Sequence, residues 1–297
     1  MQLDLTDASL PAYKALASSV RLRIIRLLSS NPRMNVTDLA VQLNLSPAII
    51  LMHLNKLEAA GLIGFEKKGH NKISKLKVDE IYVRFPKKIY SAFEAYETQI
   101  PVGQYTAFSV QPSCGLAGEK DYIGKVDNPS YFMSPERMKA GMVWFSNGFL
   151  EYQAPNLLNA DKHLEMLDLS VELGSEFPFS NNVWPSDITF FINNIEIGTW
   201  TSPGDFADVR GKYTPAWLPD NVNQYGIQKI LRITGHGSYL DGQPFTDISL
   251  DSLDTNQQTF TIRFEVKNDA KNQGGCTIFG KEFGNYNQDI VFKVFYS

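Results

Sequence analysis

The hydrophobic pattern changes from helical to alternating at Gly61, and this change limits the folds open to the first eighty residues. Ser46 and Pro47 mark the start of a helix, because serine caps free N–H groups and proline is tolerated at the first helical position. Gly61 marks the end of that helix, since glycine accepts the left-handed conformation of a helix cap. Between these signals, apolar residues recur at helical spacing: Ile50, Leu54 and Leu57. After Gly61 they alternate, so the sequence predicts a helix followed directly by a β-hairpin.

Two further helices are expected before this one. Residues 16–28 place apolar side chains at helical spacing. The exposed face of that helix is expected to carry three basic residues: Arg21, Arg23 and Arg26. A shorter helix begins near Asn35, with the expected inward residues Leu39, Val41 and Leu43. Strands at 62–65 and 73–78 enclose the basic turn 67–72. Three helices followed by a basic hairpin are the arrangement of a winged helix-turn-helix.

The same residues resemble a known family. The stretch KALASSVRLRIIRLL at 14–28 resembles the first long helix of ArsR-type transcriptional regulators. TDLA at 37–40 and the residues of 45–63 resemble their helix-turn-helix. The resemblance covers residues 10–78 and implies a DNA-binding regulator. ArsR-type regulators usually have polar residues where this chain has Leu51 and Met52, so base reading here is expected to rely on thymine methyl groups.

Metal sensing, which many ArsR-type regulators carry out through a Cys-x-Cys pair near the helix before the recognition helix, is not expected here. Residues 30–45 contain no cysteine, and the four histidines are scattered: His53, His70, His163 and His236. A metal site needs three or four clustered ligands. His53 is expected to pack or to contact a phosphate, and no metal or other cofactor is predicted.

Charge is distributed unevenly along the chain. Residues 1–90 hold 14 Lys and Arg against 7 Asp and Glu, a net charge of +7, whereas residues 91–297 carry -11. Lys and Arg give DNA affinity by neutralising phosphates. Residues expected at the bases are Ser46, Pro47, Ala48, Leu51 and Met52. Residues expected at phosphates are Lys56, Lys67, Lys68, His70 and Lys72. A winged helix that contacts proteins instead of DNA is the alternative.

Beyond residue 80 the chain reads as β structure. Hairpins are expected at 142–152, around Asn147-Gly148, and at 188–200, around Asn193-Asn194. Further strands are expected at 164–173, 227–233, 259–266 and 289–296. Residues 89–100 fit either a helix or a hairpin with 105–109, and the hairpin is favoured. The predicted fold class is therefore α+β and multi-domain: a winged helix-turn-helix at 1–80, a linker or dimerisation segment at 81–103, and a jelly-roll-like antiparallel β-sandwich at 104–297.

A ligand site is expected in the β-sandwich, around the long loop 201–221, because connections of that length inside a domain are usually functional. Indole rings beside Asp, Asn and Arg suit a sugar, whose flat face stacks while its hydroxyls form hydrogen bonds. The candidate residues are Trp184, Asp187, Trp200, Asp205, Arg210, Tyr213 and Trp217. The alternative is that these tryptophans are core residues and that the loop covers an edge strand. Residues 184–189 and 198–205 also resemble the C-terminal domain of long ArsR-type regulators, which implies a jelly-roll effector domain.

Several function classes are not expected. The chain lacks a Gly-x-Ser-x-Gly motif, a Cys/His pair at readable spacing and a phosphate-binding glycine loop, so it is not predicted to be an enzyme. It has no apolar run that could span a bilayer and no signal peptide pattern. Cys114 and Cys276 are expected to be free thiols. The sequence predicts a cytoplasmic, homodimeric regulator that binds double-stranded DNA and senses a small polar ligand, a carbohydrate being the first candidate. The alternative is a constitutive DNA-binding protein whose sandwich is a scaffold for protein partners.

Overall fold

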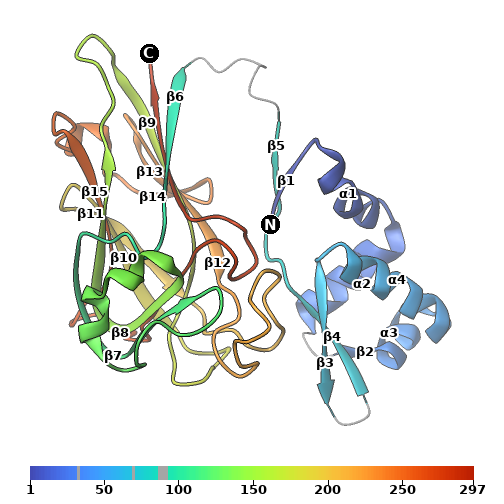
Figure 1. The fold of residues 1–297 in the computed structure, drawn as a ribbon. Helices are drawn as coiled ribbons and strands as arrows, with labels where there is room; N and C mark the ends of the chain where they lie inside the picture. The colour runs from blue at the N-terminus through green and yellow to red at the C-terminus, as the bar shows by residue number, and fades with distance from the viewer. Residues whose placement is uncertain (32–33, 69–70, 86–92) are drawn as a thin grey trace. The chain divides into compact units, whose positions relative to one another are not determined.

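The computed structural model describes residues 1–31, 34–68, 71–85 and 93–297 (Figure 1). The chain divides into two compact units. The first is Met1–Tyr90 with Asp208–Arg210, and the second is Ser91–Ala207 with Gly211–Ser297. No helix in the described part of the chain is long and apolar enough to cross a membrane.

The first unit is built of short helices and a small sheet. Its helices are η1 (Asp7–Ser9), α1 (Leu10–Leu16), α2 (Ser19–Ser30), α3 (Val36–Leu43) and α4 (Pro47–Ala59). Its strands are β1 (Gln2–Asp4), β2 (Met34–Asn35), β3 (Ile63–Lys68), β4 (Asn71–Leu76) and β5 (Tyr82–Arg84). Strands β2, β4 and β3 form an antiparallel sheet in that order, and β1 pairs with β5 in parallel. The predicted winged helix-turn-helix is therefore confirmed.

Local signals set the ends of α3 and α4. Asn35 caps α3 by accepting a hydrogen bond from the Asp38 N–H at 3.0 Å, and the Asp38 carboxylate accepts one from the Asn35 N–H at 3.0 Å. Ser46 is the N-cap of α4 and Pro47 its first residue, as predicted. Gly61 follows the end of α4 with a φ of +71°, a conformation that glycine adopts without strain.

Three details of the helical prediction are wrong. The expected long helix at 14–28 is two helices, because Ala17 and Ser18 leave the helical conformation between α1 and α2. Arg21 is 8% exposed instead of lying on the outer face. Its guanidinium donates to the carbonyls of Lys14 and Ala15 in the last turn of α1, where unpaired helix carbonyls need donors. Val41 is 75% exposed, and Ala40 is buried in its place.

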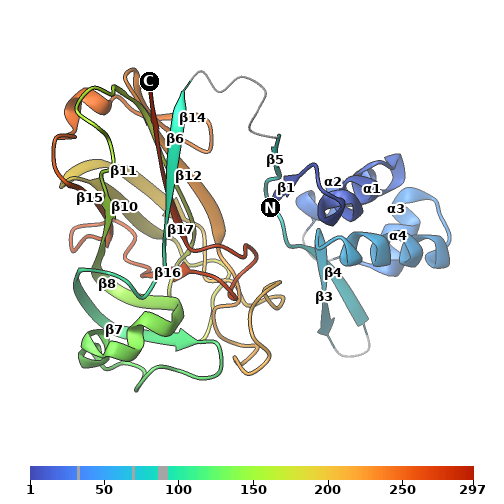
Figure 2. The ribbon, with the colours of Figure 1, turned by 45° about the horizontal axis from the view of Figure 1, so that its top comes forward.

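The second unit is an antiparallel β-sandwich. Its strands are β6 (Glu94–Ile100), β7 (Ala107–Gly118), β8 (Ala140–Pro155), β9 (Leu164–Gly174), β10 (Ser186–Ile192), β11 (Ile195–Ser202), β12 (Ile227–Thr234), β13 (Gly237–Leu240), β14 (Gln243–Thr246), β15 (Thr259–Val266), β16 (Cys276–Phe279) and β17 (Ile290–Tyr296). Its 3₁₀ turns are η2 (Pro129–Met133), η3 (Pro135–Lys139) and η4 (Leu250–Ser252). Figure 2 shows these strands from a second direction.

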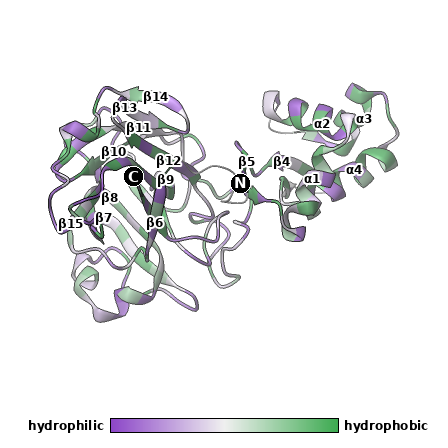
Figure 3. Cartoon of the chain, turned by 90° about the horizontal axis from the view of Figure 1, so that it is seen from above, coloured by the Kyte–Doolittle hydropathy of each residue, from purple (hydrophilic) through white to green (hydrophobic). Residues whose placement is uncertain are grey.

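The strands enclose a main apolar core, and a smaller apolar cluster around Met142, Trp144 and Phe283 lies beside it. Their order is β11-β10-β15-β8-β16-β9-β12-β13-β14, with β7 paired to β8 and β17 paired to both β9 and β6. The largest fully buried side chains of the core are aromatic: Tyr105, Tyr152, Phe132, Phe145, Phe190, Phe260, Phe264 and Phe292. Figure 3 shows hydrophobic and hydrophilic residues interleaved along the chain, as strands with one buried face require.

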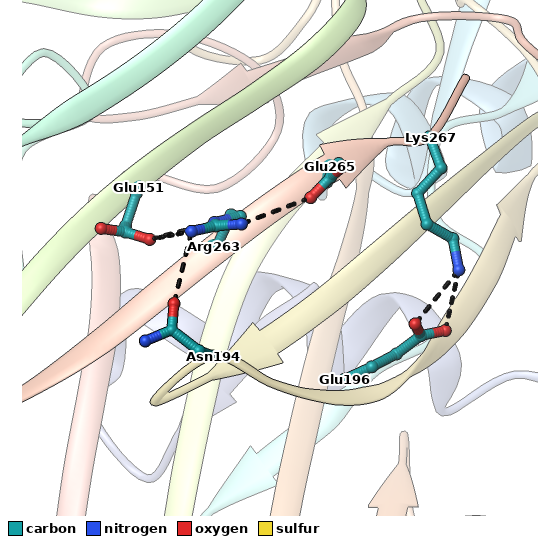
Figure 4. A network of polar contacts seen from close by, with 6 residues as sticks. All are labelled: Glu151, Asn194, Glu196, Arg263, Glu265 and Lys267. Atoms are coloured by element: carbon teal, nitrogen blue, oxygen red, sulfur yellow. Dashed lines mark hydrogen bonds and ion pairs between the residues drawn. The ribbon is translucent and has the colours of Figure 1, made fainter. Parts of the chain in front are cut away.

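Ion pairs link β8 to β15, and the start of β11 to the residue that follows β15 (Figure 4). Arg263 donates to the Glu151 carboxylate at 2.6 and 3.0 Å, and its guanidinium lies 4.5 Å from the centre of the Phe149 ring. Lys267 donates to Glu196 at 3.0 Å. Because these groups satisfy one another across strands, they fix strand register and are not a ligand site.

The hairpin predictions have mixed outcomes. The turn at Asn193 and Asn194 is confirmed, with φ of 49° and 64° between β10 and β11. The turn at Asn147-Gly148 is wrong, since β8 runs continuously through it. Gly148 is needed there for a different reason: a Cβ atom on it would lie 1.8 Å from the Ser109 carbonyl oxygen of β7.

The segment 81–103 is built into both units. Strand β5 pairs with β1 in the first unit, and β6 pairs with β17 in the second. Residues 94–100 are thus a strand, but the expected hairpin with 105–109 is wrong, because β6 pairs with the far end of the sequence. A role of the segment in dimerisation stays a prediction.

Candidate functional sites

Helix α4 has a buried face and an exposed face, and the residues predicted at DNA bases lie on the exposed one. Ile50, Leu54 and Leu57 are completely buried. Leu51 and Met52 are 41% and 45% exposed. The other predicted contacts of this helix are exposed as well: Ser46, Pro47, Ala48 and Lys56. The pattern that buries one side of α4 therefore leaves its N-terminal half open to a partner.

The sequence analysis missed one residue of this exposed row, Ile49, which is 42% exposed. Its N–H donates to the Ser46 hydroxyl at 3.4 Å. The first turn of α4 carries no acidic residue, so the positive end of the helix dipole is not neutralised there. A row of apolar side chains beside a positive helix end fits the groove of a duplex, where methyl groups and phosphates lie close together.

His53 lies on the same helix and is half-buried. Its Nδ1 is 3.5 Å from the Arg21 guanidinium. Burial, followed by the nearby charges of Arg21 and Lys56, lowers the pKa of His53 below its ordinary value. A shift in this direction favours the neutral imidazole, which lies beside Arg21 of α2.

The β3–β4 hairpin forms the predicted wing. Its backbone register pairs Lys67 with Lys72 and Lys68 with Asn71. The side chains of the three lysines, and the whole of His70, lie outside the described residues. Their contacts with DNA phosphates stay a prediction.

A pocket of about 210 Å³ opens in the second unit, at one end of β7, β8 and β9. Its walls are apolar and largely aromatic: Tyr122, Val126, Met142, Trp144, Phe177, Pro178, Phe179 and Val222. Its polar lining residues are Ser113, Asp127, Glu176 and Asn223. Trp144 has room beside β7 because its cross-strand neighbour is Gly115, on which a Cβ atom would lie 2.2 Å from the indole. The volume is many times the roughly 10–15 Å³ that a single water needs in a cavity, so the pocket can hold a small molecule.

Glu176 is the most buried charged residue of this pocket, with 7% exposure. Its Oε1 accepts a hydrogen bond from the Ser113 hydroxyl at 2.7 Å, and its Oε2 accepts one from the Asn223 amide at 2.9 Å. Burial raises its pKa to about 8, and the nearby charge of Asp127 acts in the same direction. Asp127 accepts a hydrogen bond from the Cys114 N–H at 3.0 Å. Neither carboxylate has a Lys or Arg partner in the described part of the chain.

The aromatic walls meet at steep angles. The Tyr122 and Trp144 rings are 6.0 Å apart with an interplanar angle of 67°, so they form a corner of the pocket. Phe179 is 68% exposed and has a φ of +83°, a left-handed conformation that is strained for a bulky residue. Strain of this kind is concentrated at binding and catalytic sites.

Three of the residues predicted at the ligand lie directly behind this pocket. Trp184 packs on Phe177 with ring centres 4.7 Å apart, and Trp217 packs on Tyr122 at 5.0 Å. Asp205 is completely buried, accepts a hydrogen bond from the Phe177 N–H at 2.9 Å, and has a pKa raised to about 9 by burial and by Glu176. They support the lining residues without belonging to the lining itself.

The other four predicted residues lie elsewhere. Trp200 packs against the core, with the Lys229 ammonium 4.7 Å from its ring centre. Asp187 accepts hydrogen bonds from Thr201 at 2.7 Å and from the Asn272 N–H at 3.0 Å. Tyr213 is half-buried, and Arg210 clusters with the first unit. The structure therefore does not bring all seven residues together.

Sequence reasoning missed the lining residues. The available signal was Phe177-Pro178-Phe179 directly after a predicted strand, with an acidic residue before it. Among the residues that the structure describes, no group of three or more His, Cys, Asp and Glu is arranged to hold a metal ion.

Comparison with known proteins adds the following. No curated protein matches the chain. The chain is similar to a carbohydrate-binding module, CBM36, in complex with calcium and xylotriose, with 10% identity over 67% of this chain and 98% of that one and a TM-score of 0.29. It is also similar to CBM51 from Clostridium perfringens GH95 in complex with methyl-galactose, with 9% identity over 66% of this chain and 99% of that one and a TM-score of 0.25. Residues 18–64 match the bacterial regulatory protein family arsR. The α2–α4 segment with the start of the wing is therefore an ArsR-family helix-turn-helix domain.

Proposed function

We propose that this protein is a DNA-binding transcriptional regulator whose β-sandwich binds a small ligand in the pocket lined by Tyr122, Trp144, Phe177 and Phe179. The observation that carries the DNA-binding half is the exposed row on α4, within a helix-turn-helix that matches a regulator family. A regulator of this kind acts in the compartment that holds the chromosome, so we place it in the cytoplasm.

In this proposal α4 enters the major groove with its N-terminal half. Ser46, Ala48, Leu51 and Met52 face base edges, with the apolar side chains on thymine methyl groups. Lys56 and the wing lysines Lys67, Lys68 and Lys72, with His70, contact phosphates. Phosphate contacts supply most of the affinity and little sequence preference.

The proposal includes a homodimer. One small helix-turn-helix seldom gives enough affinity alone, and two copies that share a two-fold axis read a palindromic site. A ligand can change DNA binding in such a dimer only by binding one arrangement of the two reading heads more tightly than another. We propose the segment 81–103 as the element that carries this change.

The DNA-binding half is tested by electrophoretic mobility shift with the full chain, over a series of salt concentrations. The double substitution Lys67→Ala/Lys68→Ala is expected to weaken binding about equally for all duplexes and to reduce the slope of log K against log salt by about one to two. The matched control is Lys120→Ala/Lys125→Ala, which removes two exposed lysines from the second unit. No shifted duplex at low ionic strength, or a salt slope that the double variant leaves unchanged, would contradict the proposal.

The ligand-binding half depends on the pocket alone. A concave apolar wall with a few buried polar groups at its base is the usual form of a small-molecule site. The sequence analysis expects a polar ligand such as a carbohydrate, and the pocket lies beside three of the residues on which that expectation depends. If no small molecule binds, the sandwich is better explained as a scaffold for protein partners.

A further inference from the structure

The polar groups at the base of the pocket leave more hydrogen-bond acceptors than donors free for a ligand. The Ser113 hydroxyl is used by Glu176, and the Asn223 amide hydrogens are used by Glu176 and by the Thr277 hydroxyl. The Asn223 side chain is 5% exposed, and its amide oxygen has no partner. The four non-aromatic polar residues therefore offer oxygen acceptors while their donors are already committed.

The pocket also holds acidic groups that have no basic partner in the described part of the chain. Glu176 and Asp127 both line it, and Asp205 lies behind it next to Glu176. None of the three forms an ion pair within the described ranges 1–31, 34–68, 71–85 and 93–297. Asp127 is exposed, but Glu176 and Asp205 are buried, and a buried carboxylate that is ionised without a cation loses its hydration without compensation. Burial is the main cause of the raised pKa of Glu176, about 8, and a cation bound beside the carboxyl would favour its ionised form.

The walls supply a second attraction for positive charge. Tyr122 and Trp144 form a steep corner, and the side chains of Phe177 and Phe179 complete the aromatic lining. The face of an aromatic ring attracts a cation placed over it, and rings arranged around a small space are the usual way in which proteins bind alkylated ammonium groups. Apolar alkyl groups on the nitrogen gain from the same walls.

A neutral sugar fits this lining less well. A sugar hydroxyl can donate to these acceptors, but the four non-aromatic polar residues leave no donor for its oxygens, and a neutral molecule gains nothing from the acidic side chains. We propose that the pocket binds a small organic cation with an alkylated ammonium group, its charge facing Glu176 and its alkyl groups the rings of Tyr122, Trp144 and Phe179. This inference rests on the proposed function, in which the same pocket is the ligand site of the regulator.

The test uses isothermal titration calorimetry with the full chain and three probes: choline, 3,3-dimethyl-1-butanol and glucose. The second probe has the shape of choline with a carbon in place of the charged nitrogen. Choline is expected to bind about tenfold or more tightly than the neutral alcohol, because cation–ring attraction in a desolvated site is worth about that factor. Glucose is expected to bind more weakly than choline.

Two substitutions locate the binding. Phe179→Ala removes one wall, and since this side chain is 68% exposed the variant should fold; Phe85→Ala, at 63% exposure in the first unit, is its matched control. Glu176→Gln removes the carboxyl that can ionise beside a bound cation, at nearly constant shape, and Glu119→Gln, an exposed glutamate, is its control. Both pocket variants are expected to weaken choline binding about tenfold, and both controls to leave it unchanged.

The possible results separate this inference from the proposed function. If the neutral alcohol binds as tightly as choline, or if glucose binds and choline does not, the cation inference is wrong while the pocket remains a ligand site. If choline binds equally to wild type and to Phe179→Ala, it binds elsewhere and the inference is also wrong. If no probe binds, the inference fails, and the mobility shift assay decides independently whether the protein binds DNA.

Discussion

Glu172 and Glu176 lie four residues apart at the end of β9 and just beyond it, and their surroundings differ in kind. Both are buried, and burial raises the pKa of each to about 8. The Glu172 carboxylate accepts hydrogen bonds from backbone N–H groups only, at 2.8 to 3.1 Å: those of Gly226, Asn285 and Tyr286. Glu176 accepts its hydrogen bonds from the side chains of Ser113 and Asn223.

This difference separates two roles that a buried carboxylate can have, one in structure and one in binding. A backbone N–H group cannot rotate away from its acceptor. Glu172 therefore connects two loops to β9, and its carboxylate oxygens are already used by these donors. Side-chain donors can rotate, so Glu176 can change partners when a ligand enters the pocket beside it. The two residues have the same type and the same direction of pKa shift. Their donors differ, and this difference supports a structural role for Glu172 and the binding role that we propose for Glu176.

The strongest test of this distinction is Glu172→Ala. The substitution leaves two buried backbone N–H groups and the partly buried one of Asn285 without an acceptor. Each buried group costs about 1–3 kcal/mol, so we expect a loss of about 3 kcal/mol or more in the free energy of unfolding. Urea denaturation followed by circular dichroism measures it, with the exposed Glu119→Ala as control. A loss under about 1 kcal/mol would mean that the loops are held by other contacts.

Glutamine substitutions at Glu172 and Glu176 test the comparison through the pH dependence of the free energy of unfolding. A carboxyl whose pKa is higher in the folded than in the unfolded protein favours folding at low pH, and this contribution is lost as the pH rises from about 5 to about 8. For Glu176→Gln the stability relative to wild type should therefore increase with pH, by up to about 1.4 kcal/mol between pH 6 and pH 7. At Glu176 the new amide can donate to the Ser113 oxygen, because that hydroxyl can rotate.

At Glu172 the same substitution places an amide NH₂ against fixed N–H donors. Glu172→Gln is therefore expected to destabilise at every pH, with the pH-dependent gain superimposed on that loss. Urea denaturation at pH 5, 6, 7 and 8 measures both variants. If Glu176→Gln destabilises as much as Glu172→Gln at pH 6, the two sites are equivalent and the binding role of Glu176 loses its support.

Features that depend on local contacts are predictable from the sequence, whereas features that depend on contacts between distant segments are less so. Helix α4 is fixed by signals within sixteen residues, from the Ser46 cap to Gly61, and its exposed and buried faces follow from spacing alone. The break between α1 and α2 was missed because apolar spacing continues across it. Arg21 was placed outside because its acceptors, the carbonyls of Lys14 and Ala15, become available only after that break.

The pocket was only partly predictable, because its lining comes from segments far apart in the sequence. These lining residues meet only when β7 pairs with β8 and β16 joins β8 to β9: Ser113, Trp144, Glu176 and Asn223. Two tryptophans that the sequence predicts at the ligand instead pack against residues of the lining: Trp184 on Phe177, and Trp217 on Tyr122. Residues with large side chains mark the neighbourhood of a site, whereas the lining itself depends on strand register and on backbone conformations such as the positive φ of Phe179.

The smallest expected effect, and the finest test of the comparison, is that of Asp127→Asn. Asparagine keeps the oxygen that accepts from the Cys114 N–H, and it tolerates the φ of +61° at this position, so we expect a change in unfolding free energy under about 0.5 kcal/mol. The pKa of Glu176 should fall because one repelling charge is lost, yet stay above its ordinary value because burial is the larger cause. The pH series of wild type and variant, each paired with its Glu176→Gln partner, measures this shift, with the exposed Asp269→Asn as control.

Choline binding at pH 7 should weaken a few-fold. If the pKa of Glu176 returned fully to 4.5, repulsion by Asp127 would be the dominant cause, and Glu176 would no longer be comparable with Glu172, whose pKa burial raises first and most.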